Sequence, residues 1–136
     1  MPHNKTTISF LMKINKMLNT SEILSSVIIK GMQEVKAKEI VSLDLRNIEV
    51  SICDFFIVCH STSNTHSSAI AESVIEETLL SIKEKPWKKE GLTNGDWILL
   101  DYGNVVVHIF QKEIRDYYKI EKLWGDANIE FIKETG

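Results

Sequence analysis

The stretch DWILLDYGNVVVHIF, residues 96–110, decides the fold. Two apolar runs flank the dipeptide Gly103-Asn104, a pattern typical of a β-hairpin with a two-residue turn. With that turn, Tyr102 lies opposite Val105, and the alternation of side chains divides the hairpin into two faces. The first face is apolar and is expected to pack against helices; it consists of Ile98, Leu100, Tyr102, Val105, Val107 and Ile109.

The second face of the hairpin carries an acid and an imidazole among apolar side chains. Its members are Trp97, Leu99, Asp101, Val106, His108 and Phe110. In this register His108 lies opposite Leu99 and diagonal to Asp101, within reach of a long side chain or a water. Three interpretations follow: the pair is catalytic, it binds a metal, or it belongs to a surface that contacts another molecule.

The rest of the chain predicts helices and strands that complete a sheet around this hairpin. The first predicted element is a helix from a capped start at Asn19–Glu22 to about Ala37, and strands follow at Ile40–Leu45 and Phe55–Cys59. A second helix has an apolar stripe from Ile70 to Ile82 and ends before Pro86. The hairpin at Trp97–Phe110 comes next, and then a helix from about Lys112 to Tyr118 and a short tail. The continuous apolar run FFIVC is expected of a central strand covered on both faces. We therefore expect one α/β domain at residues 20–136, with a mixed β-sheet flanked by helices, and a loosely ordered N-terminal extension at residues 1–19.

Composition and charge restrict the possible partners. A chain of 136 residues with 43% hydrophobic residues is the size of one domain and can bury a core. Its net charge of −3 provides no general attraction to DNA or an anionic membrane, and no apolar run approaches the roughly 20 residues that span a bilayer. Cys53 and Cys59 lie in or beside one predicted strand, where they cannot bridge, so we expect reduced thiols in a cytoplasmic protein.

Signatures of hydrolytic and metal-binding sites are weak in this sequence. A catalytic triad that uses His108 and Asp101 would also need a serine nucleophile, and no G-x-S-x-G motif supplies one. The serines that follow the strand predicted at Phe55–Cys59 are ordinary loop residues: Ser61, Ser63, Ser67 and Ser68. His60 and His66 form no recognised zinc pattern with either cysteine. No glycine-rich loop precedes the helix start at Asn64, which Asn64 or Thr65 is expected to cap. We therefore expect no metal and no cofactor.

A nucleotidyltransferase is the main enzymatic alternative. Such enzymes hold two metal ions on a triphosphate through carboxylates clustered on neighbouring strands. Asp44 and Asp54 are candidates, but no pair of acids lies two residues apart on a predicted strand. The expected activity is therefore not enzymatic, with a nucleotidyltransferase-like enzyme acting on a nucleotide as the alternative.

From Ser21 to Ala127 the sequence strongly resembles the ribosomal silencing factor family, also called Iojap or RsfS proteins. The similar segments are DFFIVCHSTSN, AIAE, PWKKEG and DWILLDYGNVVVHIFQKEIRDYYKIEKLW. Their most specific part has the order W-x-x-x-D-x-G-x-x-x-x-H-x-F and then R-x-x-Y-x-x-E-x-L-W, supplied by Trp97, Asp101, Gly103, His108, Phe110, Arg115, Tyr118, Glu121, Leu123 and Trp124. The sequence departs from the family at Ser61, where glycine is usual. This departure bears on the loop conformation, because a residue with a Cβ resists positive φ.

The resemblance implies a translation repressor rather than an enzyme. It implies binding to the large ribosomal subunit at its fourteenth protein (uL-fourteen), where a bound factor blocks joining of the small subunit under nutrient limitation. It also implies a fold related to nucleotidyltransferases without their catalytic acids, and a homodimer in isolation.

On this basis we interpret the second face of the hairpin as the surface that binds the ribosomal protein. The expected binding residues are Trp97, Leu99, Asp101, His108 and Phe110, with Glu90 at the rim in the loop before the hairpin. The alternative is that a helix covers this face, and the segment with Arg115 and Tyr118 is the candidate. Trp87 and Trp124 are expected either in the core or in dimer contacts.

Overall fold

The computed structural model describes residues 5–49 and 51–134, which form one α/β domain around a mixed six-stranded sheet. The strands lie in the order β3-β4-β5-β2-β1-β6, so β3 and β6 are the two edges. The elements are α1 (Lys5–Glu34), β1 (Lys38–Asp44), β2 (Phe55–Ser61), α2 (Asn64–Ile82), β3 (Lys88–Glu90), β4 (Trp97–Asp101), β5 (Val105–Gln111), α3 (Lys112–Tyr118), α4 (Ile120–Leu123) and β6 (Asn128–Phe131). The predicted fold class is confirmed.

The centre of the sheet is formed by β2 and β5, which run parallel, while every other strand pair is antiparallel. All residues of β2 are buried, as expected for a continuous apolar strand with helices on both faces. Ser61 is the last residue of β2 and does not have positive φ, so its Cβ causes no strain at the start of the following loop.

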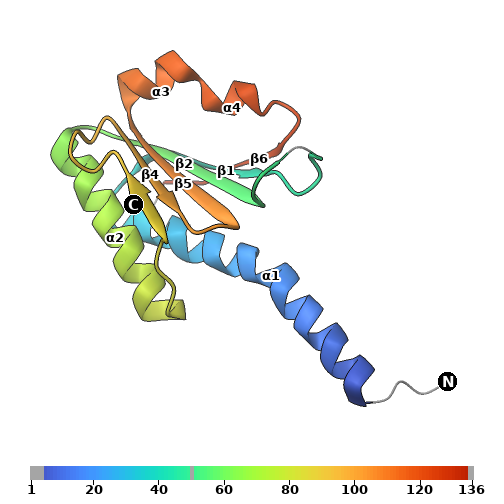
Figure 1. The fold of residues 1–136 in the computed structure, drawn as a ribbon. Helices are drawn as coiled ribbons and strands as arrows, with labels where there is room; N and C mark the ends of the chain where they lie inside the picture. The colour runs from blue at the N-terminus through green and yellow to red at the C-terminus, as the bar shows by residue number, and fades with distance from the viewer. Residues whose placement is uncertain (1–4, 50, 135–136) are drawn as a thin grey trace.

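Helices α1 and α2 cover one face of the sheet, and α3 and α4 lie on the other (Figure 1). The larger core lies under α1 and α2 and includes Leu24, Ile28, Met32, Ile70, Val74 and the predicted apolar face of the hairpin. The two helices approach each other closely at Gly31, where an added Cβ would lie 2.8 Å from the Cα of Val74. A glycine at this crossing therefore sets the distance between α1 and α2.

The predicted start of the first helix at Asn19–Glu22 is wrong, because α1 already begins at Lys5. No proline or glycine lies between Lys5 and Lys30, and adding a residue to an existing helix costs far less than starting one. The Ser21 hydroxyl donates to the carboxylate of Asp54 and does not cap a helix end. The N-terminal part of α1 extends away from the sheet in Figure 1. The division between residues 1–19 and 20–136 stays a prediction.

Three short elements were not predicted: β3, α4 and β6. The segment of β3 was expected to be a loop, and the segments of α4 and β6 were expected to be a tail. The edge strands β3 and β6 consist of exposed residues, so neither shows the apolar alternation of a half-buried strand. Among the described residues, no helix combines the length and apolar character that a bilayer crossing requires.

Candidate functional site

The β4–β5 hairpin has the predicted register. The Tyr102 N–H donates to the Val105 carbonyl at 2.9 Å across the turn. Leu99 lies opposite His108, and Asp101 lies opposite Val106. The Asp101 carboxylate accepts a hydrogen bond from the Gly103 N–H at 2.7 Å, so the acid stabilises the turn that the sequence pattern predicted.

The apolar face of the hairpin packs against α1 and α2, as predicted. All six of its members are buried: Ile98, Leu100, Tyr102, Val105, Val107 and Ile109. The only hydroxyl among them is satisfied, since the oxygen of Tyr102 lies 2.9 Å from the Thr78 Oγ1 of α2. This face is structural.

The opposite face is divided between a covered half and an open half. On β5, His108 is 4% exposed and Phe110 is fully buried, so the prediction that both are exposed is wrong. The cause is the position of α3, which begins directly after β5 and turns the chain back over the sheet. Ile114, Ile120 and Trp124 of this returning segment pack on the same cluster. The alternative of a covering helix therefore holds for β5.

His108 is fixed within an aromatic cluster rather than paired with Asp101. Its Nδ1 accepts a hydrogen bond from the Trp97 Nε1–H at 3.1 Å. An indole nitrogen can only donate, so the proton of the neutral imidazole lies on Nε2, which has no hydrogen-bond partner among the described residues. The ring stacks on Phe110 and meets the Phe56 ring edge-on at 4.6 Å. Burial lowers the pKa of His108 to about 4, so the ring is neutral near pH 7.

The open half of the face lies on β4 and β3. Trp97, Leu99 and Asp101 are partly exposed, and Glu90, which pairs with Leu99 across the strands, is exposed. We call these four residues the β4 patch. Glu90, Gly91, Trp97 and Leu99 line a hollow of about 320 Å³. Trp97 forms one wall of it and rests on Phe110 and Tyr118, with ring centroids 4.8 and 5.0 Å away.

Two residues that the sequence reasoning did not assign to the site complete this edge. Gly91 has φ +78, and an added Cβ would lie 2.0 Å from the Trp97 carbonyl oxygen, so only glycine lets the chain turn this close to β4. Trp87 is 70% exposed, and its backbone N–H donates to the Asp101 carbonyl at 3.0 Å, which brings this residue to the Asp101 end of β4. The sequence pattern did not predict strand β3, so it gave no sign that Trp87, directly before β3, lies next to β4. Trp124, by contrast, packs edge-on against Phe56 in the core.

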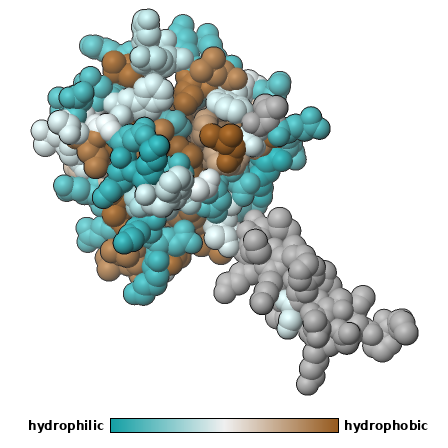
Figure 2. Space-filling view, viewed as in Figure 1, coloured by the Kyte–Doolittle hydropathy of each residue, from teal (hydrophilic) through white to brown (hydrophobic). Residues whose placement is uncertain are grey.

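Surface hydrophobicity alone does not single out this patch. On the face of the molecule seen in Figure 2, hydrophobic side chains form separate areas between hydrophilic ones. Exposed large apolar residues also occur elsewhere, for example Leu80 on α2 and Phe131 on β6. The β4 patch differs in combining a hollow, a fixed indole and two carboxylates.

Two more of the described histidines, His60 and His66, and several loop serines hold the fold together. His60 is buried, with its Nδ1 3.0 Å from Arg115 Nη1, and its pKa is lowered by burial and by the charge of Arg115. His66 joins α2 to the end of α1, because its Nε2 bonds the Val35 carbonyl at 2.7 Å. Ser63, rather than Asn64 or Thr65, caps α2, and Ser61 and Ser67 bond each other.

The carboxylates considered for metal binding have protein partners. Asp44 accepts two hydrogen bonds from the Arg46 guanidinium, of 2.9 and 2.7 Å, and a third of 3.0 Å from the Arg46 backbone N–H, and Asp54 accepts from Ser21. Within residues 5–49 and 51–134, no group of three or more His, Cys, Asp or Glu side chains is arranged to hold a metal ion. Cys53 and Cys59 are unbridged, as predicted, and burial raises the pKa of each to about 12.

Comparisons with known proteins agree with the motif order around the hairpin. The family model described as "Ribosomal silencing factor during starvation" matches residues 18–135. The chain is 39% identical over 107 residues to the ribosomal silencing factor RsfS of Halalkalibacterium halodurans, an alignment covering 76% of this chain and 87% of the relative. It is 40% identical over 95 residues to RsfS of Bacillus subtilis, covering 68% and 76% of the two chains.

The fold agrees with the same assignment. A crystal structure of a Chromobacterium violaceum protein superposes with a TM-score of 0.72 at 33% sequence identity, covering 84% of this chain and 94% of that one. The family match extends over nearly all of the domain, and it includes every residue of the β4 patch. The chain belongs to the ribosomal silencing factor (RsfS) family.

Proposed function

We propose that this protein binds the large ribosomal subunit through the β4 patch, at the fourteenth protein of that subunit (uL-fourteen). A factor bound there blocks joining of the small subunit sterically and represses translation when nutrients are limiting. Membership of a family named for ribosomal silencing during starvation supports the general role. The hollow beside Trp97, on the half of the sheet face that α3 and α4 leave open, is the observation that supports this surface.

The β4 patch has the features of a protein-binding site. Trp97 and Leu99 offer partly exposed apolar surface around a hollow that a side chain of the partner can fill. The indole of Trp97 is already held by His108 and Phe110, so little conformational entropy is lost when it is buried by a partner. His108 and Phe110, expected at first to contact the partner themselves, support Trp97 from below.

The charges of the patch suit a basic partner. Glu90 is paired with Lys88 at 3.0 Å, and both side chains are about half exposed, so this ion pair can exchange for one with a partner. Asp101 uses one carboxylate oxygen on the turn. Its second oxygen and Glu90 give the patch two acceptors for cationic side chains.

Co-sedimentation with separated ribosomal subunits tests the proposal. We expect the protein to pellet with large subunits and not with small ones, and to reduce subunit joining. Leu99→Glu places a charge in the hollow and should weaken pelleting by a factor of about ten or more. Asp101→Lys should also weaken it, because it sets a cation against a basic surface.

The matched control is Leu80→Glu, which makes the same change at an exposed position of α2. It should leave pelleting unchanged. If Leu99→Glu and Leu80→Glu pellet alike while both remain folded, the binding surface lies elsewhere. Turnover of a labelled nucleoside triphosphate with magnesium, lost in Asp44→Ala or Asp54→Ala, would favour the nucleotidyltransferase alternative instead.

The remaining expectations concern the free protein. A cytoplasmic location and a homodimer in isolation stay predictions. Sedimentation velocity of the free chain measures the oligomeric state directly, and the Leu99→Glu variant shows whether a dimer uses the same patch.

A further inference from the structure

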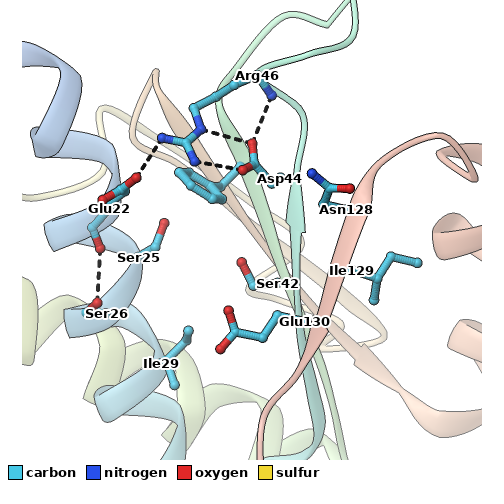
Figure 3. Close-up of a pocket in the computed structure, with 11 residues that line it drawn as sticks. Glu22, Ser25, Ser26, Ile29, Ser42, Asp44, Arg46, Asn128, Ile129 and Glu130 are labelled. Carbon is cyan, nitrogen blue, oxygen red and sulfur yellow. Dashed lines mark hydrogen bonds and ion pairs between the residues drawn. The ribbon is translucent and has the colours of Figure 1, made fainter.

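A second cavity lies far from the β4 patch, between α1 and the β1–β6 edge of the sheet (Figure 3). Its volume is about 320 Å³, at the lower end of the roughly 300–1,000 Å³ usual for small-molecule pockets. The lining comes from α1, β1, the segment after β1, the first residue of β2, and β6: Glu22, Ser25, Ser26, Ile29, Ser42, Asp44, Arg46, Phe55, Asn128, Ile129 and Glu130.

The cavity is polar where a helix normally packs on a sheet through apolar side chains. Ser25 of α1 is 5% exposed and Ser42 of β1 is 7% exposed. Both point from their elements into the space between helix and sheet (Figure 3). The Ser25 Oγ is buried and has no hydrogen-bond partner among the described residues, although buried polar atoms are nearly always paired. The Ser25 hydroxyl therefore offers a free hydrogen-bonding position to a molecule bound in the cavity.

Edge strand β6 adds two more polar groups to the same space. Glu130 pairs with Ser42 across the strands, and Asn128 pairs with Asp44, so their side chains share the α1 face of the sheet. No hydrogen bond or ion pair joins the side chains of Glu130 or Asn128 to any other described residue. Among the described residues that line it, the cavity therefore has one unpaired carboxylate, one unpaired amide and two unpaired hydroxyl groups, those of Ser25 and Ser42; the Ser26 hydroxyl bonds the Glu22 carbonyl.

The charges of the lining select the class of ligand. Among the described residues that line the cavity, Arg46 is the only cation, and its guanidinium is already bound to both oxygens of Asp44 and to Glu22. Glu22, Asp44 and Glu130 outnumber it, so the cavity disfavours phosphate or carboxylate groups. The hydrogen bonds from Arg46 lower the pKa of Asp44, and this carboxylate stays ionised near neutral pH.

We propose that this cavity binds a small aliphatic ammonium compound, such as a diamine or polyamine. One ammonium group pairs with Glu130, and the remaining N–H groups of the ligand donate to the oxygens of Ser25, Ser42 and Asn128. Ile29 of α1 provides apolar surface for the methylene chain between two nitrogens. The site is independent of the β4 patch, since it lies on the opposite face and at the opposite edge of the sheet.

Isothermal titration of the full chain with spermidine tests the inference. We expect saturable binding with one ligand per chain. Glu130→Gln removes the unpaired charge and should weaken binding by about tenfold or more, because the ammonium group then loses its ion-pair partner and keeps only a hydrogen bond to a neutral amide. Ser42→Val fills the cavity with methyl groups and should abolish binding, while the unliganded protein melts at the same or a higher temperature.

The control is Glu76→Gln, which changes the net charge equally at an exposed position of α2. It should alter the affinity by less than about twofold. The inference is overturned by three results: no saturable heat, equal weakening by Glu76→Gln and Glu130→Gln, or saturable binding of inorganic phosphate in place of spermidine. Ribosome pelleting is not a readout here, so failure of this inference and failure of the proposed function are separate results.

Discussion

At the scale of single residues, His108 of the hairpin is constrained by burial and by one hydrogen bond. The sequence placed it beside Asp101, but its only hydrogen bond within the described part of the chain is the one that it accepts from Trp97. Protonation would replace the Nδ1 lone pair with a second N–H, break this bond and bury a charge. Burial and the hydrogen bond from Trp97 thus both favour the neutral imidazole. The neutral imidazole in turn holds the Trp97 indole of the β4 patch in place.

We predict that His108 makes stability fall as the pH is lowered. An unperturbed histidine has a pKa of 6.5, and burial lowers the pKa of His108 to about 4 in the folded state. Above pH 6.5 the ring is neutral in both states; between these two values only the unfolded chain gains the proton, so unfolding becomes easier as pH falls. The difference corresponds to on the order of 3 kcal/mol. Urea denaturation between about pH 7 and pH 4 measures it.

The comparison for this prediction is His108→Gln, which cannot titrate. His60, whose pKa is also lowered, contributes to the slope of both proteins. The difference between the two slopes therefore reports His108 alone. Parallel slopes would show that His108 takes up its proton equally in the folded and unfolded states.

At the scale of elements, successive side chains of strand β4 point to opposite faces of the sheet, so that one set stabilises the core and the other is available for binding. Leu100 is fully buried against α1 and α2, while Leu99 lies on the opposite face in the β4 patch. We predict that Leu100→Ala lowers the free energy of unfolding by roughly 2–5 kcal/mol. Leu99→Ala, the same change one residue earlier, should cost about 1 kcal/mol or less. Thermal melting and subunit pelleting of both variants check this.

In the pelleting measurement we expect the reverse order, with Leu99→Ala affected more than Leu100→Ala. Leu99→Ala removes contact surface from the hollow, whereas folded Leu100→Ala retains it. If Leu99→Ala destabilises the protein as much as Leu100→Ala does, then Leu99 belongs to the core and the patch is smaller than proposed.

Elements whose pattern is local could be predicted from the sequence. The hairpin register follows from its two-residue turn, β2 from a continuous apolar run, and α3 from residues that match its observed bounds of Lys112–Tyr118. Each of these features depends on residues that are close together in the sequence. The same reasoning gave the apolar face of the hairpin correctly.

The features that the sequence did not reveal depend on distant partners. β6 exists because its backbone pairs with β1, more than eighty residues earlier, and none of its side chains is buried. The burial of His108 depends on the direction in which α3 returns over the sheet. Alternation placed Trp97, His108 and Phe110 correctly on one face, but it could not show that α3 and α4 cover β5 and leave β4 open.

At the scale of the whole molecule, the two sheet edges have different surroundings. The β3 edge lies beside the β4 patch on the face that carries α3 and α4. The β6 edge lies beside the polar cavity on the α1 face. A partner as large as a ribosomal subunit can therefore cover the first edge while the second stays open to a small ligand.

The two edges also provide a matched test of which one meets the ribosome. Trp87 next to β3 is 70% exposed, and Phe131 of β6 is 77% exposed. Because both side chains are mostly in solvent, Trp87→Ala and Phe131→Ala should each change stability by only about 0.5 kcal/mol. We predict that Trp87→Ala weakens pelleting with large subunits by about tenfold, since an exposed aromatic side chain beside the Gly103 turn, next to the β4 patch, is buried on binding. Phe131→Ala should pellet like the unaltered protein. The opposite result, with Phe131→Ala weakened and Trp87→Ala unchanged, would move the ribosome-binding surface to the β6 edge and remove the support for the β4 patch.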